Sequence, residues 1–273
     1  MNAATIGWGW PSRDAAALDD EQLAGCYAIN DRRRQSVRVN FVASIDGATT
    51  DHGVSGGLSG QADKRVFDLL RRLSDVILVG AGTVRAEGYG AMRLDAASAQ
   101  LRRASGLADQ PVFAIVSGTL ALDPESAVFT DAPVRAIVVT IGTSSHVKKE
   151  ALSRVADVLV CGEERLDVTV MLDAFAKRGL RRVLCEGGPT LFGALLDADR
   201  VDELCLTISP LIEAGNARRI AAGPLPETRR MALHHVLVSD STLMLRYVRL
   251  RGESADAGGS RKREALFAGR LVT

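Results

Sequence analysis

The stretch 183–196 (VLCEGGPTLFGALL) contains residue types that could bind a charged ligand. An apolar run ends at Glu186, Gly187 and Gly188 follow, and Pro189 opens a segment with apolar residues at helical spacing. Glycines let a backbone approach a ligand closely, proline is favoured in the first helical turn, and free N–H groups at a helix N-terminus attract anions. The pattern therefore predicts a strand, a turn that binds an anion such as a phosphate, and a helix.

A second junction of the same kind lies at 76–88 (VILVGAGTVRAEG). Gly80 and Gly82 make the turn, and Thr83 adds a hydroxyl where a helix would begin. One such turn is often only a tight connection, but two in one sheet favour a pyrophosphate cofactor with one end at each turn. Neither junction has the GxGxxG pattern of a Rossmann site or the GxxxxGK pattern of a P-loop, so we expect neither.

Short apolar runs rich in Val and Ile alternate with segments of helical period from Val37 onward. The predicted strands are 37–44, 75–80, 111–117, 134–140, 157–162, 181–186, 201–210, 233–239 and 242–250. The predicted helices are 61–73, 95–105, 146–155, 168–179 and 190–198. This alternation predicts an α/β fold with a mostly parallel sheet and helices on both faces. We expect the last two strands, joined by the polar turn 240–241, to form an antiparallel hairpin.

Composition and charge exclude several classes of partner. The 273-residue chain carries 34 Lys and Arg against 33 Asp and Glu, so we expect no nucleic-acid partner and no membrane partner. We find no apolar run long enough for a transmembrane helix and no signal-peptide pattern, which predicts a cytoplasmic protein. The four cysteines are scattered without CxxC spacing, so we expect reduced thiols and no metal site.

The distribution of hydrophobic residues along the chain divides it into three parts. We expect an N-terminal arm over 1–36 with one helix around 14–29, and a domain over 37–251. The remaining residues, 252–273, have few hydrophobic side chains at their start and are predicted to be a flexible tail.

Three motifs, in order, resemble those of a known family. They are 42–47 (VASIDG), 71–84 (RRLSDVILVGAGTV) and 184–212 (LCEGGPTLFGALLDADRVDELCLTISPLI). They resemble the reductase half of the bifunctional deaminase/reductase family of riboflavin biosynthesis, over about residues 37 to 250. The zinc signature of the deaminase half (HxE and PCxxC) is absent, so we expect a standalone reductase.

The resemblance implies a dihydrofolate-reductase-like three-layer sandwich that uses NADPH. The implied reaction is that of 5-amino-6-(5-phosphoribosylamino)uracil reductase, in which a hydride reduces the ribose at C1 to ribitol. The relatives are homodimers, and the apolar last strands could supply such an interface. The implied cofactor contacts are Ala43, Gly80, Gly82, Thr83, Glu87, Ser117, Gly187, Gly188, Pro189, Thr190, Leu191, Phe192, Gly193 and Ala194.

The implied substrate contacts are Ser55, Arg71, Arg93 and Glu186. We expect the reaction in a cleft bounded by Ser44, Asp63, Arg71 and Glu186. Two guanidinium groups, from Arg71 and Arg93, would suit a sugar phosphate, and Glu186 could accept hydrogen bonds from a ring or an amine. Catalysis would be mostly positioning, with Glu186 and Asp63 as the candidate catalytic groups.

A second resemblance leaves the substrate open. Residues 62–83 also resemble the dihydrofolate reductase stretch in which an acid is followed by a phenylalanine one helical turn later. On that match Asp63 would hydrogen-bond and help protonate a pteridine, and Phe67 would stack on it. The alternative is that Asp63 is favoured by its place in the first helical turn and Phe67 belongs to the core. A dihydrofolate or dihydropterin therefore stays as an alternative substrate.

Two positions depart from the family pattern on the substrate side. Asn40 stands where the family commonly has a lysine, and 55–58 (SGGL) lacks a tryptophan, so that Gly57 is expected to widen the site. These changes keep a third possibility open, a nucleotide-binding protein without catalysis. Asp46, directly before a glycine, is interpreted as a turn residue and not as a catalyst.

Overall fold

In the part of the chain that the computed structural model describes, residues 17–29, 31–224 and 227–250, nine strands form one mixed sheet. The strands are β1 (Ser36–Ser44), β2 (Val76–Gly80), β3 (Val112–Val116), β4 (Ala136–Thr140), β5 (Ala156–Val160), β6 (Arg182–Cys185), β7 (Glu203–Ser209), β8 (Met231–Ser239) and β9 (Thr242–Arg249). The helices are α1 (Asp20–Tyr27), α2 (Gln61–Arg72), α3 (Ala81–Ala86), α4 (Ala96–Ala104), α5 (Ala127–Thr130), α6 (His146–Ser153), α7 (Val168–Lys177) and α8 (Pro189–Asp197).

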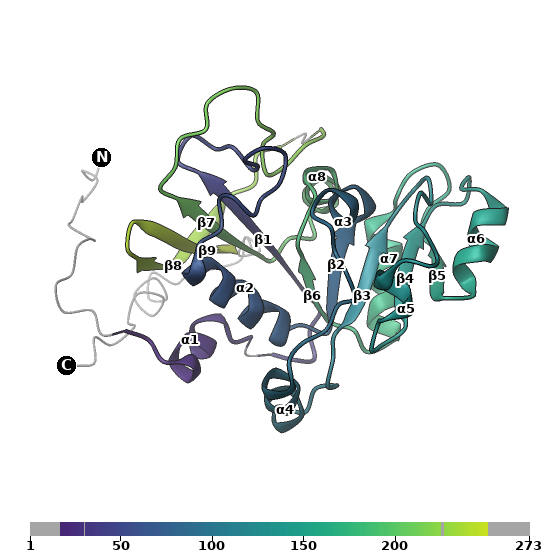
Figure 1. The fold of residues 1–273 in the computed structure, drawn as a ribbon, viewed down its shortest axis with the longest axis horizontal. Helices are drawn as coiled ribbons and strands as arrows, with labels where there is room; N and C mark the ends of the chain where they lie inside the picture. Colours follow the sequence, from purple (N-terminus) through teal and green to yellow (C-terminus); the bar gives the residue numbers. More distant parts are fainter. Residues whose placement is uncertain (1–16, 30, 225–226, 251–273) are drawn as a thin grey trace, which may run out of the picture.

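The strand order is β5-β4-β3-β2-β6-β1-β7-β9-β8, with β5 and β8 at opposite edges (Figure 1). Every pairing from β5 to β7 is parallel, whereas β9 pairs antiparallel with both β7 and β8. The predicted parallel sheet and C-terminal hairpin are therefore confirmed. The helix start expected at Thr83 corresponds to the short helix α3, of six residues. The four-residue helix α5 was not predicted, because so few residues show no helical period.

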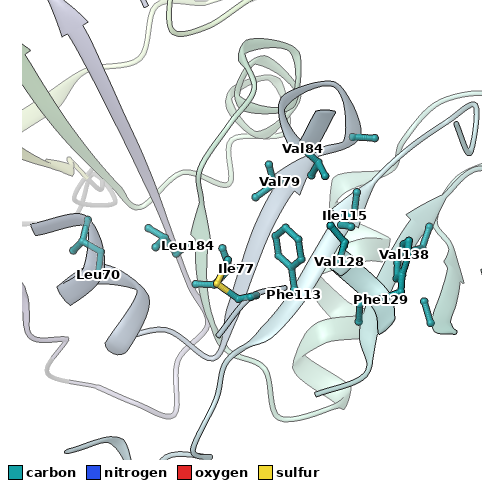
Figure 2. Close-up of a cluster of buried hydrophobic side chains, with 14 of the residues drawn as sticks. Leu70, Ile77, Val79, Val84, Phe113, Ile115, Val128, Phe129, Val138 and Leu184 are labelled. Atoms are coloured by element: carbon teal, nitrogen blue, oxygen red, sulfur yellow. The ribbon is translucent and has the colours of Figure 1, made fainter. Parts of the chain in front are cut away.

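Helices cover both faces of the sheet, and the side chains of each strand alternate between two cores. Ile77 and Val79 of β2 pack into a cluster with residues of α1, α2, α3, α5 and α6, part of which Figure 2 shows. Val76 and Leu78 of the same strand pack into the opposite cluster, with α7 and α8. Burial of both faces explains why these strands read as continuous apolar runs, and each fully buried Ile or Leu contributes about 1.5–3 kcal/mol.

The helix α1 is held against the sheet by a buried ionic cluster. Glu203 of β7 forms ion pairs with Arg38 of β1 (2.7 Å) and Arg246 of β9 (2.9 Å). The same two guanidinium groups donate to the last carbonyls of the helix, Arg246 to Cys26 and Arg38 to Tyr27. Burial raises the pKa of the Glu203 carboxyl, but the two arginines outweigh it and hold that pKa below its usual value.

The N-terminal helix is shorter than the predicted 14–29. A capping box between Asp19 and Gln22 sets its first turn, and the helix ends at Tyr27. Residues 1–16 and the predicted tail 252–273 lie outside the described residues, so the division at 36 and 251 stays a prediction. Within the described ranges, none of the helices has the length and apolar character needed to cross a membrane.

Candidate active site

A cavity of about 1140 Å³ lies where the carboxyl ends of the central strands meet the glycine turns. Its walls come from β1, α2, the turn between β2 and α3, the segment after α3, the turn between β6 and α8, and the loop between β7 and β8. Binding sites for small molecules commonly measure about 300–1,000 Å³. The cavity is thus large enough for a dinucleotide and a second ligand together.

The two predicted glycine turns contact each other. The amide N–H of Gly80 donates to the carbonyl of Gly187 (2.8 Å), and the peptide bond between Gly187 and Gly188 is cis. Gly187 has φ +96°, a conformation that glycine adopts readily. A Cβ atom on Gly188 would lie 2.5 Å from Oγ1 of Thr83, so a side chain here would displace the Thr83 hydroxyl. Together the turns form one narrow backbone cradle in the cavity wall.

The first turn of α8 leaves its N–H groups available to a ligand. Gly188 is the N-cap and provides no side-chain cap, and Pro189 occupies the first turn. In the predicted run 187–194, the residues that line the cavity are Gly188, Pro189, Thr190, Leu191 and Ala194. Phe192 instead packs on Phe41 with ring centroids 5.4 Å apart. A side chain on Gly193 would overlap the carbonyl of Ala222, which explains the glycine there by packing.

Glu186 is held by three hydrogen bonds at the inner end of the cavity. Arg71 donates from Nε to Oε1 (2.6 Å) and from Nη2 to Oε2 (2.8 Å), a bidentate pair. The hydroxyl of Tyr89 donates to Oε2 (2.9 Å). The Glu186 side chain is 1% exposed and that of Arg71 is 19% exposed. Burial lowers the pKa of Arg71, but the hydrogen bond and charge of Glu186 outweigh it and raise that pKa.

The helix α2 presents a line of side chains to the cavity. Asp63, Phe67 and Arg71 succeed one another at one-turn intervals and all line it. Asp63 is buried, and its Oδ2 accepts a hydrogen bond from the Ser59 hydroxyl (2.6 Å). The Arg71 guanidinium lies 4.0 Å from the centroid of the Phe67 ring. Asp63 and Phe67 are therefore part of the cavity wall.

The end of β1 lies beneath the cavity. Ala43 and Ser44 are buried and are not among its lining residues. The Ser44 hydroxyl donates to Asp46, whose carboxylate also accepts from the amides of Glu213 (3.2 Å) and Ala214 (2.7 Å). These hydrogen bonds, that of Ser44 first, lower the pKa of Asp46 to about 2. Asp46 thus stabilises a turn, in agreement with its interpretation from the sequence.

Three other predicted residues occupy different positions. Glu87 lines the cavity and accepts from the amide of Ser55 (2.8 Å), which also lines it. Ser117 is buried just behind the lining, between Val116 and Gly118.

Arg93 lies apart from the cavity. Its side chain is exposed, and Nη2 donates to the carbonyl of Asp131 (2.8 Å), so Arg93 and Arg71 do not form the predicted guanidinium pair. Arg71 is already bonded to Glu186, which is why neither arginine is free as a phosphate clamp in this conformation.

Comparison with known proteins identifies the family. The sequence profile of the RibD C-terminal domain matches residues 35–245, a range that contains every residue lining the cavity. The chain belongs to the RibD C-terminal domain family. A 2,5-diamino-6-ribosylamino-4(3H)-pyrimidinone 5′-phosphate reductase from Archaeoglobus fulgidus is 32% identical over 186 residues, which cover 67% of this chain and 83% of that protein.

Two further comparisons agree with this family. The riboflavin biosynthesis protein RibD of Bacillus amyloliquefaciens is 28% identical over 66% of this chain, which spans 46% of that protein. A pyrimidine reductase-like protein from Corynebacterium diphtheriae has a TM-score of 0.74 and 28% identity, with 80% of this chain and 93% of that chain covered. The resemblance seen in the sequence motifs is confirmed, and so is the dihydrofolate-reductase-like fold class.

At Asn40 and Gly57, where this chain departs from the family pattern, the structure supports one expectation and corrects the other. Asn40 lines the cavity, so the change from the family's usual lysine alters its wall. Gly57 does not line it, and a side chain there would overlap the carboxylate of Asp51. The expectation that Gly57 widens the site was wrong, because the missing side chain would point at Asp51.

Sequence reasoning missed several side chains of the cavity wall, among them those of Tyr89, Lys64 and Arg218. Tyr89 follows α3 in a glycine-rich segment, and its isolation among small residues is the signal that could have drawn attention to it. Lys64 of α2 and Arg218 of the loop between β7 and β8 are exposed cations that line the cavity. Neither forms an ion pair with any residue of the described ranges. Nothing in the local sequence around Arg218 indicates that this residue lines a cavity whose other residues lie far away in the chain.

Proposed function

We propose that the protein is an NADPH-dependent reductase of riboflavin biosynthesis. Its substrate would be a pyrimidine linked to ribose 5-phosphate, which it reduces at C1 of the sugar. The observation that carries this proposal is the single cavity that joins the glycine cradle to the buried Glu186 and Asp63. The relatives' names support the same substrate class.

The residues of the cradle fit a dinucleotide. A side chain on Gly188 would displace the Thr83 hydroxyl, and the N-terminus of α8 offers uncapped N–H groups for a pyrophosphate. When bound, the cofactor supplies a hydride to the substrate carbon. The preference for the 2′-phosphorylated form is part of the proposal, with Ser117 behind the lining as the candidate residue near that phosphate.

The residues on the substrate side of the cavity would position the substrate and deliver one proton to it. Hydride addition to C1 of the ring-opened ribosylamine must be accompanied by one proton for the product to be a neutral amine. Asp63, with its Ser59 partner, is the proposed relay for that proton, and Glu186 accepts an N–H of the pyrimidine. Lys64 and Arg218 are proposed to face the sugar phosphate, since Arg71 is bonded to Glu186.

A pterin or folate is the weaker alternative. A pteridine would have to stack on Phe67, but one face of that ring is already covered by the Arg71 guanidinium at 4.0 Å from the centroid. Displacing the Arg71 guanidinium from the Phe67 ring would also break its bidentate ion pair with Glu186. Binding of a pyrimidine substrate needs no such displacement of Arg71.

An absorbance assay of NADPH oxidation separates the candidates. We expect turnover with the phosphoribosylamino-pyrimidine and none with dihydrofolate or dihydropterin. Turnover with the pterin alone would replace the proposed substrate. Cofactor binding without oxidation of NADPH in the presence of any of the three compounds would favour the non-catalytic alternative. Parallel assays with NADH test the proposed preference for NADPH.

We also propose a homodimer in the cytoplasm. The outer strand β8 exposes Leu233 (46%) and Val236 (41%), and its free edge could pair with a second copy. Light scattering of the purified chain would give the mass of a dimer, and replacement of both residues by Lys would give a monomer. A monomeric wild-type protein would contradict this part of the proposal.

A further inference from the structure

Tyr89 is fixed in place from three directions. Its ring stacks on Phe113 of β3 with centroids 5.8 Å apart and an interplanar angle of 9°. Its amide donates to the carbonyl of Val84 (3.0 Å), which ties the residue to the end of α3. Its hydroxyl donates to Oε2 of Glu186. A half-buried tyrosine held this firmly presents its hydroxyl to one point of the cavity wall.

The hydrogen bonds to Glu186 leave little of its carboxylate open. A carboxylate has about four acceptor positions, two on each oxygen. Among the described residues, Oε2 accepts from both Arg71 Nη2 and Tyr89, and Oε1 accepts only from Arg71 Nε. One acceptor position, on Oε1, therefore has no donor among the described residues, and with the side chain 1% exposed only a donor that reaches the cavity wall directly could fill it.

We propose that Tyr89 is a positioning residue that fills Oε2 of Glu186, so that the carboxylate presents Oε1 alone to a single N–H donor of the substrate ring. This inference rests on the proposed function for the identity of the ring. Its geometric part, that the Tyr89 hydroxyl orients the Glu186 carboxyl, concerns the free protein. Without this hydroxyl, Glu186 would have a second open position and could bind a ring in more than one register.

Arg71 contacts the carboxyl from α2, and Tyr89 contacts it from the segment after α3. Replacing Tyr89 by Phe removes the hydrogen bond to Oε2 and leaves both hydrogen bonds from Arg71 in place.

The test is Tyr89→Phe, with Tyr27→Phe as a matched control, because Tyr27 is a buried tyrosine of α1 and does not line the cavity. We expect kcat/KM to fall about tenfold, the usual order for a lost hydrogen bond to a charged group. The Kd for NADPH should not change. In Tyr27→Phe both quantities should match the wild type. An unchanged kcat/KM in Tyr89→Phe would overturn the proposal.

Two further measurements keep the outcome unambiguous. The carbon NMR chemical shift of the Glu186 carboxyl in the free protein needs no turnover, so it tests the role of Tyr89 even if the proposed substrate is wrong. We expect this chemical shift to change in Tyr89→Phe, and an unchanged chemical shift would refute the inference. In a Glu186→Gln background, Tyr89→Phe should cause no further loss of kcat/KM, whereas an additive loss would mean that Tyr89 acts independently of Glu186.

Discussion

Arg71 and Glu186, 115 positions apart in the chain, form a bidentate ion pair with N···O distances of 2.6 and 2.8 Å. Both were expected to contact the substrate separately. Their pairing means that α2 and the β6–α8 turn form one rigid wall of the cavity, and that Arg71 acts on the ligand mainly by fixing the carboxylate. The predictions below follow from this arrangement.

Arg71→Lys should impair turnover more than cofactor binding. Lysine keeps the positive charge but cannot form the two parallel hydrogen bonds to Glu186. We expect kcat/KM to fall about 10- to 100-fold, the range for lost hydrogen bonds to a charged group. Steady-state kinetics and NADPH titration measure the two effects. An unchanged kcat/KM would show that the bidentate geometry is unimportant.

Arg218→Ala should remove part of the preference for a phosphorylated substrate. Arg218 lines the cavity, whereas its neighbour Arg219 is exposed and does not, which makes Arg219→Ala the matched control. We expect kcat/KM for the phosphorylated substrate to fall about tenfold, with little change for its dephosphorylated analogue. An equal loss with both substrates would place Arg218 away from the phosphate. Lys64→Ala, measured in the same way, tests the second cation.

Gly188→Ala should weaken NADPH binding. The added Cβ atom would lie 2.5 Å from Oγ1 of Thr83, so either the Thr83 hydroxyl would have to rotate away from the site or one of the two glycine turns would have to move. We expect a rise in the Kd for NADPH of about tenfold or more, since such overpacking costs about 1–3 kcal/mol. Gly25→Ala in α1 is the control, because its Cβ atom would meet nothing within 4 Å. Calorimetric binding at the wild-type level in Gly188→Ala would argue against the cradle.

The ionic cluster at Glu203 should make stability depend on pH. Because the pKa of this carboxyl is lowered in the folded state, its stabilising effect is complete above the ordinary glutamate pKa and disappears as the pH falls through the lowered folded value. Glu203→Gln should reduce the free energy of unfolding by about 3–5 kcal/mol at neutral pH, since two buried guanidinium groups lose their partner.

Urea titration across the acid range measures this dependence, with the exposed Glu164→Gln as the control. The slope of stability against pH should be smaller in Glu203→Gln than in the wild type. Parallel curves for these two proteins would contradict the role of Glu203.

The sequence predicted the sheet well because buried parallel strands read as apolar runs with helices between them. The glycine turns were also predictable, since a strand, two glycines and a proline leave few other structures. The direction of Arg93, the contact between Gly57 and Asp51, and the bond from Tyr89 to Glu186 all depend on segments that meet only in the folded chain. Local pattern carries no information on such contacts, which is why the substrate side was predicted less well.

Transfer of deuterium from cofactor to product tests the central claim most directly. NADPH deuterated at the transferring position of its nicotinamide would be incubated with the phosphoribosylamino-pyrimidine and the wild-type protein, and the product examined by NMR. We predict deuterium at C1 of a ribityl chain. Deuterium in the ring, or an unlabelled and unreduced sugar, would contradict the account.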